Sequence, residues 1–321
     1  MVKVSIVIPV FRVADYIEQC VQSVMAQTYN DIECIIVDDY TDDDSINRCN
    51  RLIEDYRGPI SFHVHHHSEN RGLSAARNTG IEVSSGTYLY FLDGDDVITP
   101  FCIEKMVSLA EKYPGVELVH GEACRYPLHH NDSFKRKSLF CCAKTNDEVR
   151  NSFYSHQLLW NAWNKLLLRD FITRNQLYFR EGVLYEDVLW MFFVVKYLSC
   201  VCFCNTVTYY QNVRPESIMM GTDQQTSAVH YLIVLTDILT HLTPGSEREE
   251  MSYYADDVCK QYVRHRNNVL EYDGLIKKFW RYSRQYHCLC CQLKAIAAYI
   301  VAHIPCCIPL FLYKGIRFLR K

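Results

Sequence analysis

Residues 87–100, TYLYFLDGDDVITP, join an apolar segment directly to a cluster of acids. Residues 88–92 are aromatic or aliphatic and uncharged, a pattern typical of a buried β-strand. Asp93, Asp95 and Asp96 then follow within four positions. Carboxylates so close together repel one another, so we expect a divalent cation to offset their charge where the strand ends.

The surrounding residues alternate between strand and helix patterns. Apolar runs at 4–9, 32–37 and 60–65 are typical of short strands, and apolar residues recur at helical spacing after them. This order predicts an α/β fold with a mainly parallel sheet covered on both faces by helices. Ligands of such sheets bind outside the carboxyl ends of the strands, where the acidic cluster also lies.

The acidic cluster has a functional and a structural interpretation. Mg²⁺ and Mn²⁺ take carboxylate oxygens and keep positions open for phosphate, and an Asp-x-Asp pattern in an extended segment directs both carboxylates to one side. Gly94 between them lets a ligand approach the backbone. In the structural alternative, Asp95 or Asp96 caps the helix that begins near Pro100.

Four segments of the chain resemble, in order and spacing, the successive motifs of family 2 glycosyltransferases with the GT-A (Rossmann-like) fold. They are VSIVIPVF (4–11), DIECIIVDD (31–39), NRGLSAARNTGIEVSSGTYLYFLDGDD (70–96) and WNKLLLRDFITRNQLYFREGVLYEDVLW (163–190). The resemblance covers about residues 1–220. It implies transfer of a sugar, with inversion, from a nucleoside-diphosphate donor, most often a UDP-sugar, to a hydroxyl acceptor. It also implies a divalent metal cofactor, Mn²⁺ or Mg²⁺.

The resemblance implies roles for individual residues on the donor side. The set expected to bind the nucleotide sugar is Pro9, Val10, Phe11, Asp38, Asp39, Arg77, Asp93, Gly94 and Asp95. Within this set, Asp39 accepts from the base, and Asp95 binds the metal with Asp93 as a second metal or ribose contact. Tyr40 departs from the family, which usually has a small residue there. A turn with positive φ at this point suits tyrosine poorly.

On the acceptor side, the resemblance makes Asp187 the general base, with Glu186 and Trp163 beside the acceptor. Arg214 is a candidate for a phosphate contact. The alternative for Glu186 and Asp187 is structural, since a helix dipole favours acidic residues in the first turn.

Two other classes of protein share part of this pattern. A metal-dependent nucleotidyltransferase also has carboxylates at strand ends, but we expect it to carry a Gly-rich basic loop after the first strand, and residues 9–18 (PVFRVADYIE) do not form one. A non-catalytic sugar-nucleotide-binding protein has no need of both Asp95 and Asp187, which are present here. Because no recognition motif accompanies the basic C-terminal residues, we expect no nucleic-acid partner.

We expect residues 1–220 to form the catalytic domain, with a nucleotide-binding half at 1–120 and an acceptor half at 121–220. Residues 221–321 are expected to form a helical C-terminal appendage. From residue 260 onward the chain has 12 Lys and Arg but 2 Asp and Glu, whereas the preceding residues have 22 and 35. Such a basic end favours an anionic surface as its partner.

The C-terminal region also contains 19 residues, 295–313, without a Lys, Arg, Asp or Glu. Pro305 and Pro309 interrupt this run, and basic and aromatic residues flank it at 277–287 and 313–321. This composition predicts a broken hairpin in the cytoplasmic leaflet, associated with the membrane from about residue 275, beside a lipid-linked or growing surface polysaccharide acceptor. The alternatives are a membrane span and helices packed on the catalytic domain. We therefore expect a cytoplasmic protein, peripheral on the inner face of the cell membrane.

The 16 cysteines are predicted to be free thiols. The first residues lack the charged start and long apolar core of a signal peptide, which favours a reducing compartment. Several cysteines, including Cys34, Cys200, Cys202 and Cys204, also lie within apolar runs, where burial is expected.

Overall fold

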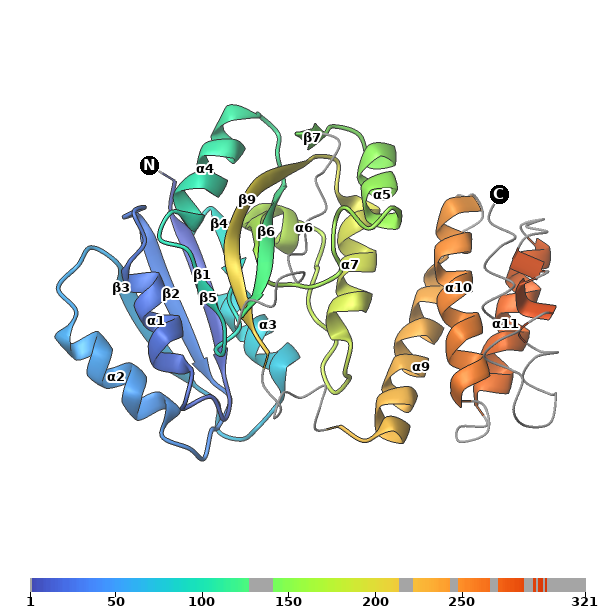
Figure 1. Cartoon of the computed structure of the whole chain (residues 1–321), viewed down its shortest axis with the longest axis horizontal. Coiled ribbons are helices and arrows are strands. Elements are labelled where there is room, and N and C mark those ends of the chain that lie inside the picture. The colour runs from blue at the N-terminus through green and yellow to red at the C-terminus, as the bar shows by residue number, and fades with distance from the viewer. Residues whose placement is uncertain are drawn as a thin grey trace. The chain divides into compact units, whose positions relative to one another are not determined.

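The computed structural model describes residues 2–126, 141–213, 222–242, 248–265, 271–285, 291–292, 294–296 and 298. They belong to two compact units. The first comprises Met1–Gly182 and Glu186–Pro215, and the second comprises Val183–Tyr185 and Glu216–Lys321. Figure 1 labels the helices and strands of both units.

The first unit is a mixed β-sheet flanked by helices. Its strands are β1 (Val4–Val10), β2 (Ile32–Asp38), β3 (Ser61–His66), β4 (Tyr88–Phe91), β5 (Val97–Ile98), β6 (Leu118–Tyr126), β7 (Cys142–Ala143), β8 (Lys165–Leu168) and β9 (Val201–Asn212). Its helices are α1 (Ile17–Met25), α2 (Ser45–Asp55), α3 (Leu73–Val83), α4 (Cys102–Lys112), α5 (Asn146–Tyr154), α6 (Arg169–Arg174) and α7 (Glu186–Tyr197).

The four strands predicted from apolar runs form the parallel part of this sheet. The strand order is β3-β2-β1-β4-β8-β6-β9-β5, with β7 paired to β9. β1 lies parallel to both β2 and β4, and β2 lies parallel to β3. The remaining part is mixed, since β8 runs antiparallel to β4 and β6. The predicted α/β fold is therefore confirmed, and all four strands of its parallel part end at one edge.

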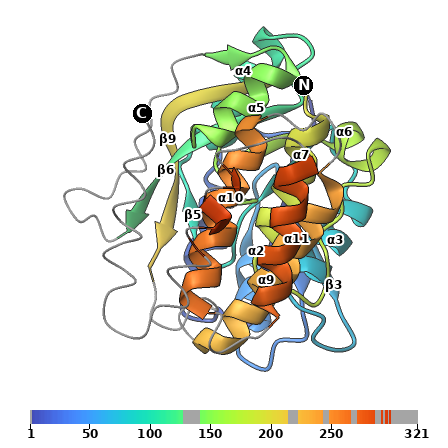
Figure 2. The ribbon, with the colours of Figure 1, turned by 90° about the vertical axis from the view of Figure 1, so that its right-hand side faces the viewer.

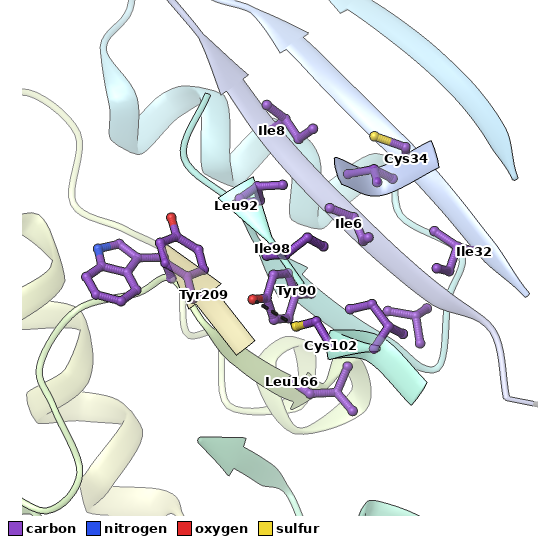
Figure 3. Close-up of a cluster of buried hydrophobic side chains, with 14 of the residues drawn as sticks. Ile6, Ile8, Ile32, Cys34, Tyr90, Leu92, Ile98, Cys102, Leu166 and Tyr209 are labelled. Atoms are coloured by element: carbon purple, nitrogen blue, oxygen red, sulfur yellow. Dashed lines mark hydrogen bonds between the residues drawn. The ribbon is translucent and has the colours of Figure 1, made fainter. Parts of the chain in front are cut away.

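β1 is buried along its whole length because helices cover both faces of the sheet. Ile6 and Ile8 point into a core that also contains residues of α1 and α4, and Figure 3 shows these two side chains with Tyr90, Leu92 and other members of that core. Val7 points to the opposite face, where α3 packs. A Cβ at Gly80 of α3 would come within 2.2 Å of Val7 Cγ1, so this glycine sets the close approach of α3 to β1.

The structure corrects the prediction for Cys202, which forms a disulfide with Cys142. The two residues are direct partners in the antiparallel pair of β7 and β9, so their side chains meet across the ladder. Cys34 and Cys204 are buried free thiols, as predicted, and Cys200 is a partly buried free thiol. The pairing depends on a contact between residues 60 positions apart, which an apolar run does not indicate.

The second unit confirms the expected helical C-terminal region. It contains α9 (Gln224–His241), α10 (Arg248–His265) and α11 (Tyr272–Gln285), which Figure 2 shows in one view. Within the described ranges, no helix combines the length and the apolar composition needed to cross a membrane. Most of the apolar run 295–313, with Pro305 and Pro309, lies outside the described residues.

Candidate active site

The parallel strands bring three of the predicted segments together at their carboxyl edge. Val10 at the end of β1 is the register partner of Asp38 at the end of β2. After β4, the Leu92 N–H donates to the Val7 carbonyl, which continues that strand beside β1. Gly94 then packs so closely that a Cβ there would lie 2.9 Å from the Pro9 carbonyl oxygen. In the structure this glycine therefore permits contact between two strand ends.

Arg77 of α3 joins the donor-side and acceptor-side acids. Its Nη2 donates to Asp93 Oδ1 and its Nη1 donates to Glu186 Oε1, each at 2.8 Å. The side chain is buried, and the guanidinium lies over the Phe179 ring at 5.3 Å from the ring centroid. Burial alone would lower the pKa of Arg77, but attraction to Asp93, Glu186 and Asp187 outweighs it and raises this pKa. The residue expected near the nucleotide thus holds acids from two distant segments in place.

Asp187 lies in the first turn of α7, next to Glu186. Its Oδ1 accepts from the Val188 N–H at 2.9 Å, and its side chain is partly exposed. Loss of surrounding water and the charge of Glu186 raise the pKa of Asp187, the charge of Arg77 opposes the shift, and the net pKa is about 8. Asp187 is therefore poised to exchange a proton near neutral pH, a property that a helix-dipole role does not require.

Lys165 of β8 interacts electrostatically with Asp187, and no role was expected for it. Its side chain is fully buried, and its Nζ donates to the main-chain oxygen of Asn161. Burial lowers the pKa of Lys165 to about 7, while the charge of Asp187 opposes this shift. The sequence does contain a sign of this burial, because Lys165 stands directly before three leucines in residues 163–168 (WNKLLL).

Asp96 supports the strand end and does not cap a helix. Its carboxylate accepts from the Tyr209 hydroxyl at 2.6 Å and from the Asn212 N–H at 2.7 Å. Helix α4 begins at Cys102, and its N-cap residue Phe101 makes no side-chain capping bond. The capping alternative is therefore wrong for Asp96.

Trp163 stacks on the ring of Tyr209, with centroids 4.5 Å apart, and is largely buried.

The acids after β4 fit a single divalent cation whose other ligands come from a substrate. Burial raises the pKa of Asp96, and the charges of Asp95 and Asp93 raise it further, so three mutually repelling carboxyl groups lie at this strand end. Across the described part of the chain, no three His, Cys, Asp or Glu side chains form a ready metal cluster. Mg²⁺ at nucleotide sites typically takes one or two carboxylates and completes its shell with phosphate and water. Asp95 is half-buried and lies two residues from Asp93, so its carboxylate is the candidate for such a ligand.

The carboxylate of Asp39 is hydrogen-bonded to the loop that precedes α3. Its Oδ1 accepts from His67 Nδ1 at 2.7 Å and from the Arg71 N–H at 2.9 Å. Its Oδ2 accepts from Asn70 Nδ2 at 3.0 Å and from the Gly72 N–H at 2.7 Å. A carboxylate has about four lone-pair positions, so these bonds occupy its acceptor capacity. The expected hydrogen bond from the base therefore has no free position on Asp39 in this structure.

The carboxylate of Asp38 makes fewer hydrogen bonds than that of Asp39. Its Oδ1 accepts from the Thr41 N–H at 2.9 Å, and its Oδ2 contacts His66 Nδ1 at 2.8 Å. The turn that follows does have a positive φ, since Tyr40 lies at φ 58°. The conformation that suits tyrosine poorly is therefore present. Arg214 lies outside the described residues.

The chain belongs to glycosyltransferase family 2. The family model described as Glycosyl transferase family 2 matches residues 5–183, which include all of the strand ends described above. The chain is 29% identical over 191 residues to the uncharacterized glycosyltransferase EpsJ of Bacillus subtilis, covering 57% of this chain and 53% of EpsJ. It is 28% identical over 219 residues to the cholesterol galactosyltransferase of Borreliella burgdorferi, covering 64% and 59%. The chain thus spans little more than half the length of these curated relatives.

Solved structures with the same fold include TarS and a mannosyltransferase. Residues 1–349 of TarS from S. aureus superpose with a TM-score of 0.68 at 16% identity, covering 94% of this chain and 90% of that one. The mannosyltransferase PcManGT of Pyrobaculum calidifontis, in complex with GDP-Man and Mn²⁺, gives a TM-score of 0.56 at 14% identity, covering 94% and 87%. These similarities confirm the predicted GT-A fold.

Replacement of Arg77 by leucine is expected to destabilise the first unit strongly. The Arg77→Leu variant leaves Asp93 and Glu186 without their shared cation, and loss of one partner from a buried ion pair costs about 3–5 kcal/mol. Arg71→Leu is the matched control, because Arg71 and Glu181 form an exposed pair at 3.2 Å worth less than about 1 kcal/mol. Urea unfolding followed by circular dichroism measures both. Equal stabilities of the two variants would contradict the bridging role of Arg77.

Proposed function

We propose that the protein transfers a sugar, with inversion, from a nucleoside-diphosphate donor to a hydroxyl group of a carbohydrate or lipid-linked acceptor. One observation carries the proposal: Arg77 binds both Asp93, at the strand end where we expect the metal, and Glu186, the neighbour of Asp187. A donor site and a proton acceptor therefore share one edge of the sheet. Membership of family 2 supports transfer chemistry over nucleotidyl transfer or binding alone.

The donor is most simply a UDP-sugar. TarS is described in complexes with UDP-GlcNAc and with UDP, whereas PcManGT is described with GDP-Man, so the shared chemistry is a nucleoside diphosphate linked to a sugar. A relative named for cholesterol supports a lipid hydroxyl as one class of acceptor. We assign residues 1–220 to the catalytic domain, with the nucleotide in the half at 1–120 and the acceptor in the half at 121–220.

The acceptor hydroxyl must lose a proton as it attacks the anomeric carbon from the face opposite the diphosphate. Ionised Asp187 accepts this proton, and a pKa of about 8 makes its carboxylate a stronger base than an ordinary aspartate. Arg77 favours the ionised form by its positive charge, and Glu186 opposes it. Trp163, packed on Tyr209, shapes the acceptor side.

A bound Mn²⁺ or Mg²⁺ would be held by Asp95, with Asp93 beside it, and would stabilise the charge of the leaving diphosphate as a Lewis acid. Asp93 keeps its orientation because Arg77 holds one of its oxygens. Asp96 takes no part in this contact, since its carboxylate is bonded to Tyr209 and Asn212.

We further propose that the C-terminal region lies on the anionic inner face of the cell membrane, next to a lipid-linked or surface polysaccharide acceptor. Helix α11 buries Leu275, Ile276 and Phe279 on one side. Lys277, Arg281 and Arg284 are exposed on the other side, at spacings of four and three residues that place them on one face. Basic residues at a membrane surface each contribute about 1 kcal/mol of attraction to anionic lipid.

The metal assignment is tested by the Asp95→Ala variant. Removal of this carboxylate should reduce UDP binding in Mn²⁺ to the level measured in EDTA, because the cation loses its protein ligand while the buried core is untouched. Isothermal titration calorimetry measures the affinity, and Asp55→Ala, an exposed acid on α2, is the control. UDP affinity in Mn²⁺ that is unchanged by Asp95→Ala would contradict the assignment.

The base assignment is tested by the Asp187→Asn variant. It should keep the UDP affinity and lower kcat by about 10²–10⁴, because the amide keeps the shape but accepts no proton. In the unaltered protein, kcat should rise with pH through about 8, since Asp187 is protonated below its pKa and ionised above it. The residual rate of Asp187→Asn should lack this rise. Collapse of donor binding in the variant would instead show a structural role.

The membrane proposal is tested by sedimentation of the full chain with lipid vesicles. The protein should pellet with vesicles that contain phosphatidylglycerol and stay in solution with phosphatidylcholine alone. Reversal of Lys277, Arg281 and Arg284 to Glu should abolish pelleting at low salt. The control with the same charge change reverses Arg51, Arg57 and Lys144, which are exposed on the first unit. If the unaltered protein stays in solution with anionic vesicles at low salt, the basic face of α11 does not bind membranes and the proposal is wrong.

A further inference from the structure

Two residues of β9, Tyr209 and Asn212, bind the turn that carries the acidic cluster after β4. The Tyr209 hydroxyl donates to Asp96 Oδ2 at 2.6 Å and accepts, more weakly, from the Asp93 N–H at 3.4 Å. The Asn212 N–H donates to Asp96 Oδ1 at 2.7 Å, and Asn212 Nδ2 donates to the Asp95 carbonyl at 2.5 Å. All three acids of the cluster are therefore bonded to β9 through a side chain or the main chain.

The pairing of β5 with β9 brings these residues together, although Asp96 and Tyr209 are 113 positions apart. Val97 and Ile98 of β5 are the antiparallel partners of Tyr210 and Tyr209. The acidic turn thus lies between β4 and a strand that is paired with β9. Tyr209 is fully buried, and Figure 3 shows it among the core side chains. Because side chains alternate along a strand, Tyr210 lies on the opposite face of β9.

The packing around Tyr209 fixes the direction from which its hydroxyl meets the acids. The ring stacks on Trp163, with 15° between the two ring planes. The main chain of Trp163 is held in turn, because Asn161 Nδ2 donates to the Trp163 carbonyl at 2.6 Å. Next to Tyr209, the Thr208 hydroxyl donates to Asn164 Oδ1 at 2.8 Å. The ring therefore cannot turn away from the acidic cluster without breaking a buried stack.

We propose that Tyr209 and Asn212 are positioning residues for the metal contact of Asp95. This proposal rests on the proposed function, which assigns the divalent cation to Asp95. Asp96 links the two parts, since its carboxylate binds β9 and its main chain continues from Asp95. Removal of a group that orients a metal ligand typically lowers metal affinity by about 10–100-fold. Because Tyr209 also stacks on Trp163, the metal side and the acceptor side of the site share one support.

Removal of the Tyr209 hydroxyl tests the proposal. Tyr209→Phe keeps the ring that stacks on Trp163 but removes one hydrogen bond from Asp96. Half-maximal UDP binding should then require about tenfold more Mn²⁺, because Asp95 is less well oriented. Saturating Mn²⁺ should restore the UDP affinity of the unaltered protein, since the hydroxyl acts on the metal contact and not on the nucleotide. Calorimetric titration with UDP at a series of Mn²⁺ concentrations measures both quantities.

Tyr210→Phe is the matched control, because it removes the same atom from the adjacent residue of β9 on the opposite face. Its Mn²⁺ requirement should equal that of the unaltered protein. Asn212→Ala is a second test at a half-buried residue, and it should raise the Mn²⁺ requirement in the same direction by removing the bond to the Asp95 carbonyl. Its control is Asn205→Ala, at an exposed residue of the same strand.

Two results would overturn the positioning role alone. One is a Mn²⁺ requirement in Tyr209→Phe and Asn212→Ala equal to that of their controls. The other is a loss of UDP affinity that saturating Mn²⁺ does not restore, which would show a general structural role. If Tyr209→Phe does not fold, as circular dichroism would reveal, the result for Asn212→Ala decides. Failure of the unaltered protein to bind UDP in Mn²⁺ would overturn the proposed function and this proposal with it.

Discussion

Arg77 places a positive charge inside the first unit, and the candidate site depends on how that charge is neutralised. The guanidinium reaches Asp93 after β4 and Glu186 at the start of α7, which are far apart in the chain. Helix α3 can present Arg77 there because Gly80, one turn further along the same helix, lets α3 pack closely on β1. A buried charge without partners would be strongly unfavourable, so both acids stabilise the fold by pairing with Arg77. The stability of the first unit and the geometry of the site therefore both depend on the ion pairs of Arg77 with Asp93 and Glu186.

Asp187 interacts electrostatically with two basic side chains, Arg77 and Lys165. Arg77 and Lys165 both favour its ionised form, whereas burial and Glu186 disfavour it. Burial has the largest effect on both groups, and the net pKa is about 8 for Asp187 and about 7 for Lys165. The pKa of Asp187 rises and the pKa of Lys165 falls, so both groups titrate near neutral pH. Such opposed shifts are characteristic of sites where a proton is exchanged, which agrees with the role proposed for Asp187.

The sequence predicted the parallel strands and the edge where the site lies, because both follow from local patterns. Apolar runs indicate strands, and the carboxyl ends of parallel strands necessarily meet at one edge. The hydrogen-bond and ion-pair partners of the acidic side chains could not be predicted in this way. Arg77 and Glu186 are 109 residues apart, and the pairing of Cys142 with Cys202 likewise depends on how distant strands align. Asp39 matched a base-binding position in the family motif, yet the conformation of residues 67–72 determines where its lone pairs are used.

We propose that this edge of the sheet binds a nucleotide sugar through a divalent cation and activates it for transfer. The most direct measurement is donor hydrolysis by the purified protein across a panel of UDP-, GDP- and TDP-sugars, with released nucleotide quantified by chromatography in Mn²⁺ and in EDTA. At least one UDP-sugar should release UDP in Mn²⁺, and EDTA should abolish the release. Hydrolysis that proceeds equally in EDTA, or absence of hydrolysis with every donor of the panel, would contradict it.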